Sequence, residues 1–164
     1  MPVSVSDYPN VRERTTLLGM TLSSELAILP RGFAEASGPG DLAHEPDAST
    51  IRKLLSAGGL EVQQLEPMAG RLPAVVQHAA DWLSPTIFVG SMLLSQNPYA
   101  IQVALNIIST YLVDALRGAR GSGMVKVSLV VEQSDRRSCR SLSFEGPASG
   151  LKDLERVIRS LQEQ

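Results

Sequence analysis

The sequence contains few of the side chains that carry most protein chemistry. Its 164 residues include one cysteine, two histidines and seven aromatic residues. Cys139 has no second cysteine with which to form a disulfide inside the chain, which suits a reducing compartment. The cysteine and the histidines could make a four-ligand zinc site only with carboxylates added, which is a rare combination for structural zinc. The sequence therefore predicts no disulfide, no metal site and no cofactor.

Sequence motifs of the common enzyme classes are also missing. The sequence around Ser91, VGSMLL, has only half of a nucleophile elbow. The glycine-rich stretch GARGSG at 118–123 lacks the lysine of a phosphate-binding loop, and a predicted strand follows it instead of a helix. No dinucleotide-binding fingerprint is present. These absences favour a protein that is not an enzyme.

Two residues keep a catalytic alternative open, a small hydrolase or transferase. His44 lies near Asp41, Glu45 and Asp47, and a histidine beside carboxylates can act as a general base. Cys139 lies between basic residues that could lower its pKa. Strand alternation places Cys139 opposite its inward-facing neighbours, which would leave it exposed. The simpler interpretation is favoured for both residues: His44 is a solvated loop histidine and Cys139 is a structural cysteine.

Charge is small overall but uneven along the chain. The formal net charge is −2, with −4 in residues 1–82 and +2 in residues 83–164. This balance does not predict binding to nucleic acid. The first ten residues show no secretory signal pattern, so the expected location is the cytoplasm.

The centre of the chain carries no charge. Residues 82–113 form a run of 32 without a charged side chain, interrupted by polar residues, glycine and two prolines. No continuous apolar segment within it is long enough for a membrane span. We predict that this run is a buried core. A membrane-acting protein that exposes residues 85–116 is a less favoured alternative.

Hydrophobic periodicity predicts an α+β fold in one globular domain over residues 1–164. The expected sheet is small and antiparallel or mixed, with a C-terminal β-hairpin, and three to four helices pack on it. One of them is a central apolar helix at about 98–117, which Asn97 caps and Pro98 begins. The hairpin strands are expected at 124–132 and 139–145, and a final helix at 150–161.

The amino-terminal half gives weaker signals. Alternation of Leu18, Met20 and Leu22 favours a strand, and residues 26–29 are compatible with a second strand or with one helical turn ended by Pro30. Residues 31–49 are rich in glycine, proline and serine and predict a mobile surface loop. A helix over 50–57, a strand over 60–66 and a helix over 73–83 are predicted next. The apolar run 86–94 is compatible with a strand or a helix.

A basic cluster follows the central helix. Its members are Arg117, Arg120, Lys126, Arg136, Arg137 and Arg140. The predicted hairpin tip carries Arg136 and Arg137 beside the C-terminus of the central helix, and this arrangement could bind a phosphate or an acidic protein surface, although a solvated turn is the simpler interpretation. With the large apolar centre, the sequence favours a protein–protein interaction or assembly module that associates with another protein or with itself.

Overall fold

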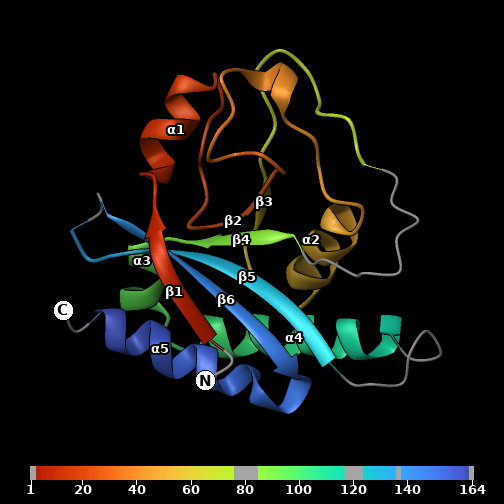
Figure 1. Ribbon diagram of the computed structural model, residues 1–164, viewed down its shortest axis with the longest axis vertical. Helices are drawn as coiled ribbons and strands as arrows, with labels where there is room; N and C mark the ends of the chain where they lie inside the picture. The colour runs from red at the N-terminus through yellow and green to blue at the C-terminus, as the bar shows by residue number, and fades with distance from the viewer. Residues whose placement is uncertain (1–2, 76–84, 117–123, 136–137, 163–164) are drawn as a thin grey trace.

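A six-stranded mixed sheet organises the part of the chain that the structure describes, residues 3–75, 85–116, 124–135 and 138–162 of a computed structural model (Figure 1). The strand order is β1-β6-β5-β4-β2-β3. The strands are β1 (Val3–Tyr8), β2 (Leu26–Leu29), β3 (Gln63–Gln64), β4 (Thr86–Val89), β5 (Met124–Glu132) and β6 (Cys139–Pro147). The helices are α1 (Val11–Leu17), α2 (Ala48–Ala57), α3 (Ser91–Gln96), α4 (Ala100–Leu116) and α5 (Lys152–Gln162), with short 3-10 turns at Pro39–Asp41 and Ala148–Leu151.

The predicted α+β class is confirmed by the way the strands pair. β5 and β6 form the C-terminal antiparallel hairpin. β1 also pairs antiparallel with β6, and β2 pairs antiparallel with β4. Parallel pairing joins β4 to β5 and β2 to β3. The hairpin, the central helix α4 and the last helix α5 lie where the sequence predicts them.

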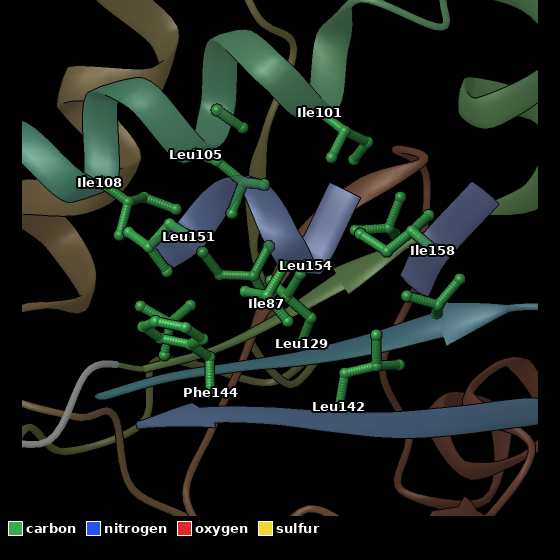
Figure 2. Close-up of a cluster of buried hydrophobic side chains, with 14 of the residues drawn as sticks. Ile87, Ile101, Leu105, Ile108, Leu129, Leu142, Phe144, Leu151, Leu154 and Ile158 are labelled. Carbon is green, nitrogen blue, oxygen red and sulfur yellow. The ribbon is translucent and has the colours of Figure 1, made fainter. Parts of the chain in front are cut away.

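One face of the sheet carries the larger core. Helices α2, α4 and α5 lie on this helix face and contribute one apolar side each to a buried cluster with the inward side chains of β4, β5 and β6. Figure 2 shows Ile101, Leu105 and Ile108 of α4 directed toward Leu154 and the strands below. Strand alternation brings every second residue of β5 and β6 to this face, which is why their valines and leucines alternate with polar residues.

The second face of the sheet is covered by α1 and by irregular segments of the chain, on the side opposite α4 and α5 (Figure 1). A separate buried cluster lies here, in which Phe33 and Leu42 pack against Phe88 and Val130 of the sheet. These two anchoring residues belong to the segment 31–49. Its mobility stays a prediction, but the segment is more than a solvated loop because it forms part of this core.

The uncharged run contains both a strand and helices. Residues 86–89 form the central strand β4, and Gly90 separates it from α3. A Cβ atom at Gly90 would lie 2.7 Å from Glu25 Oε1, so glycine allows the strand to turn beside that carboxylate. The inward side of α4 is buried, while Tyr99 and Val103 are exposed at its start and outer side. Within the described ranges, no helix has both the length and the apolar character needed to cross a membrane.

The amino-terminal region differs from the sequence prediction. Residues 14–17 belong to helix α1 and not to a strand, and β2 is the one strand in 14–30. The missed signal is the pair Asn10 and Glu13, because the Asn10 side chain accepts a hydrogen bond from the Glu13 N–H at 3.2 Å, as at a capped helix start. Strand β1 was not predicted either. The predicted connector 118–123 and residues 76–83 of the predicted helix 73–83 lie outside the described residues. The expected helix start at Pro73 was wrong, because residues 73–75 are not helical and Ala74 forms a parallel bridge with His44.

Truncation of Leu154 tests the helix-face core. Leu154 is fully buried between α5 and the sheet, so Leu154→Ala should lower the free energy of unfolding by about 2–5 kcal/mol through the cavity it leaves. Urea denaturation measures this loss. Leu54→Ala is the matched control, because Leu54 is 37% exposed on α2 and its truncation should cost less than about 1 kcal/mol. Equal losses in the two variants would contradict this assignment of the core.

Candidate functional site

Part of the second face is left uncovered, and hydroxyl side chains form it. Ser4 of β1 pairs with Ser143 of β6, and Ser143 pairs with Ser128 of β5. Thr86 of β4 pairs with Ser128, so one row of hydroxyls crosses four strands. Ser6 and Ser141 begin the next row. We call this surface the serine face, and its members are Ser4, Ser6, Thr86, Ser128, Ser141 and Ser143.

A cavity of about 370 Å³ lies where the serine face meets the segment after β2. Thr86 and Ser128 contribute hydroxyls from adjacent strands, and Lys126 lies two residues before Ser128 on the same face of β5. The opposite wall comes from the turn after β2. The remaining polar residues of the cavity are Tyr8, Arg31, Glu35 and Glu45. Its volume lies within the range of small-molecule sites, and its polar groups converge from separate elements.

Two of the charged groups in this cavity neutralise each other. Arg31 donates to both carboxylate oxygens of Glu45, with 2.9 Å between Nη2 and Oε2. The hydrogen bond from Arg31 to Glu45 raises the pKa of the guanidinium, so the pair stays ionised. Lys126 and Glu35 have no ion pair with any residue in the described ranges. The cavity therefore holds one unpaired positive and one unpaired negative group.

Tyr8 keeps its proton in this setting. Burial of the side chain, and then the nearby negative charge of Glu35, raise the pKa of the Tyr8 phenol well above its ordinary value. A protonated phenol can donate a hydrogen bond to a ligand oxygen. The Tyr8 hydroxyl is therefore available in the cavity as a neutral donor.

A second polar cluster lies at the carboxyl ends of the parallel strands β4 and β5, where ligands often bind in α/β sheets. Arg12 of α1 donates to both oxygens of Glu132, at 2.6 and 3.0 Å, and to Glu25 at 2.7 Å. The backbone N–H and hydroxyl of Ser91 both donate to Glu132, each at 3.0 Å. The N–H of Met92 donates to Glu25. Glu132 is fully buried and both its carboxylate oxygens accept hydrogen bonds, so this cluster is structural and joins α1 to the sheet. We call the contact between Arg12 and Glu132, with Glu25 and Ser91, the lock.

The predicted basic cluster is only partly described. Arg140 lies on β6, where its Nη1 donates to Asp7 of β1 at 2.7 Å. Its Nε is buried and has no hydrogen-bond partner in the described part of the protein. The other four arginines, Arg117, Arg120, Arg136 and Arg137, lie outside the described residues. Phosphate or protein binding by this cluster stays a prediction.

His44 and Cys139 are both buried. His44 Nε2 lies 2.7 Å from Glu66 Oε1, and the same oxygen accepts the Leu72 N–H at 2.9 Å. The expected partner Glu45 instead pairs with Arg31. His44 therefore joins two irregular segments of the second face, and its Nδ1 has no partner among the described residues.

The expected exposure of Cys139 was wrong. Cys139 does lie on the face opposite Leu142 and Phe144, but both faces are covered at this position and Cys139 is only 4% exposed. Burial raises the pKa of its thiol, which disfavours the thiolate that a nucleophile needs.

Comparisons with protein-family models, with curated proteins and with solved structures gave no match to this chain. The sequence already showed polar residues alternating along β5 and β6, which indicated a polar face. It gave no sign of strand β1 beside them, and so no sign of a row of hydroxyls.

In the described ranges, no group of three or more histidine, cysteine or acidic side chains could hold a metal ion.

Removal of Arg12 tests the lock. Arg12→Ala leaves the buried Glu132 carboxylate without its cation, so the free energy of unfolding should fall by about 3 kcal/mol in urea denaturation. Arg156→Ala is the matched control. Arg156 is 78% exposed and lies 3.7 Å from Asp153, so its loss should cost less than about 1 kcal/mol. If Arg12→Ala is no more destabilising than the control, the lock is not a main support of α1.

The lock also predicts a dependence of stability on pH. Burial opposes ionisation of Glu132, but the hydrogen bonds from Arg12 and Ser91 outweigh it and hold the pKa of this carboxyl below its ordinary value of 4.5. The ionised carboxylate therefore stabilises the fold fully above that pH, and the stabilisation is lost as pH falls through the lowered pKa. Melting temperatures measured between neutral and acidic pH should fall less steeply on the acid side for Glu132→Gln. The same acid slope in both proteins would contradict this role.

Proposed function

We propose that this protein is a non-enzymatic interaction module that associates with a second copy of itself through the edge strand β1. The observation that carries the proposal is the state of that edge. β1 is six residues long, lies at one end of the sheet and pairs on one side with β6 (Figure 1). Alternate residues of an edge strand direct their N–H and C=O groups away from the sheet, where another strand can pair with them.

The two edges of the sheet differ in how well they are protected. At the far edge β3 has two residues, and the side chain of Gln63 hydrogen-bonds the backbone of Thr21, Ser23 and Ser24 beside it. β1 is less protected, because it contains no proline and no lysine, and its one charged residue is Asp7 near its end. This contrast supports strand pairing at β1.

A second copy fits this edge because the strand sequence is compatible with itself. In an antiparallel pair centred on Val5, the two Val5 side chains lie together and Ser4 lies opposite Ser6 of the other copy. Asp7 lies opposite Val3 at each end of this pair, so the match is best at its centre. Val5 pairs with Leu142 and extends toward the helix-face core, yet it is 39% exposed. A neighbouring Val5 would cover this exposed apolar surface. The two sheets would then form one continuous sheet.

No observation favours the catalytic or membrane-acting alternatives over this proposal. The candidate nucleophile Cys139 is buried with a raised pKa, and His44 is engaged with Glu66. Most of the uncharged run is accounted for by β4 and the buried side of α4. The remaining apolar exposure on the helices is dispersed, whereas β1 offers backbone hydrogen-bonding groups and a valine together.

The proposal predicts a dimer that a charge at Val5 disrupts. The wild-type protein should be dimeric at tens of micromolar in sedimentation velocity. Val5→Lys should shift it to monomer, because two lysine side chains would face each other across the new strand pair. The melting temperature and circular dichroism of Val5→Lys establish that the monomer is folded.

Met68→Lys is the matched control for this variant. Met68 is an apolar residue that is 80% exposed and lies in the segment after β3, not on β1. Its replacement adds the same charge and should leave the dimer intact. A monomeric wild-type protein, or a Val5→Lys protein that is folded and still dimeric, would rule out association through β1.

A further inference from the structure

The cavity beside the serine face has a charge pattern that neither the fold nor self-association requires. Lys126 extends into it from β5 and Glu35 from the turn after β2, and within the described ranges neither forms an ion pair. Arg31 and Glu45, the other two charged residues that line the cavity, form an ion pair with each other. A ligand that carries both a negative and a positive group could pair with Lys126 and with Glu35 at the same time.

The other groups of the cavity suit the acidic end of such a ligand. Thr86 and Ser128 lie in register on adjacent strands, so their hydroxyls are about 5 Å apart along the sheet. Together with the Lys126 ammonium they can donate to a carboxylate. The Tyr8 phenol adds a neutral donor. The cavity volume of about 370 Å³ is enough for a molecule with the size of an amino acid.

We propose that this cavity binds a small zwitterion of the amino-acid class, with its carboxylate toward Lys126, Thr86 and Ser128 and its ammonium toward Glu35. The proposal goes beyond self-association and does not rest on it. Phosphate fits less well, because Glu35 and Glu45 would repel a second negative charge and, of the two cations that line the cavity, Arg31 is already paired with Glu45. A neutral sugar would bring no charge to Glu35, and to Lys126 it would bring none beyond that of Glu145, which lies opposite Lys126 in the strand register.

Calorimetric titration of the full chain with glycine, L-alanine and L-glutamine, each to millimolar concentration, tests the proposal. At least one should bind saturably. Lys126→Gln and Glu35→Gln should each weaken that binding about tenfold or more, the loss expected when a hydrogen bond to a charged group is removed. Both positions are partly or fully exposed, so both variants should remain folded. A melting curve for each variant checks this directly.

Lys53→Gln is the matched control, because Lys53 is exposed on α2 at the opposite face of the sheet and should leave binding unchanged. Inorganic phosphate and glucose, titrated in parallel, test whether the cavity binds an anion or a neutral sugar instead. The proposal is overturned if no amino acid binds saturably, if phosphate or glucose binds in preference, or if both variants bind as the wild type does. Its failure would leave the β1 dimer untouched, since that is measured by sedimentation.

Discussion

The ion pair between Arg12 and Glu132 fixes which part of the sheet is covered. It joins the first turn of α1 to the last residue of β5, and through Glu25 and Ser91 it also reaches the ends of β2 and β4. α1 is thereby held over one end of the second face, where it packs with the coil segments on Phe88 and Val130. The other end of that face stays open, and the serine face and its cavity lie there. The ion pair and the candidate site thus lie toward opposite ends of the same face.

Much of the fold follows from local sequence. Strict alternation predicted β5 and β6, and apolar periodicity predicted α4, because both are short-range signals that burial reinforces. The predicted start of α4 was wrong in detail, since Asn97 ends α3 and α4 begins at Ala100. The amino-terminal region was harder. The helix signal at Asn10 and Glu13 spans only four residues, and β1 is recognisable as a strand only when β6, more than 130 residues later, pairs with it. Long-range pairing of that kind leaves little trace in a single sequence.

The candidate site could be predicted in its parts but not as an assembly. The polar residues of β5 and β6 were visible as alternating positions, but Ser4 and Thr86 reach the same row through the register of four strands. Cys139 illustrates the opposite error. Its side was predicted correctly, whereas its burial depended on tertiary cover that α1 and the coil segments supply.

The hydroxyl row has a shape as well as a composition. Neighbouring strands in a sheet rotate by about 20–25° relative to one another, so the row from Thr86 to Ser4, which crosses four strands, turns through roughly 60–75°. The serine face is therefore a saddle and not a plane. A rigid flat partner could touch only part of it, whereas a molecular surface with the same handed twist could follow it from end to end. Shape alone thus restricts what can cover this face.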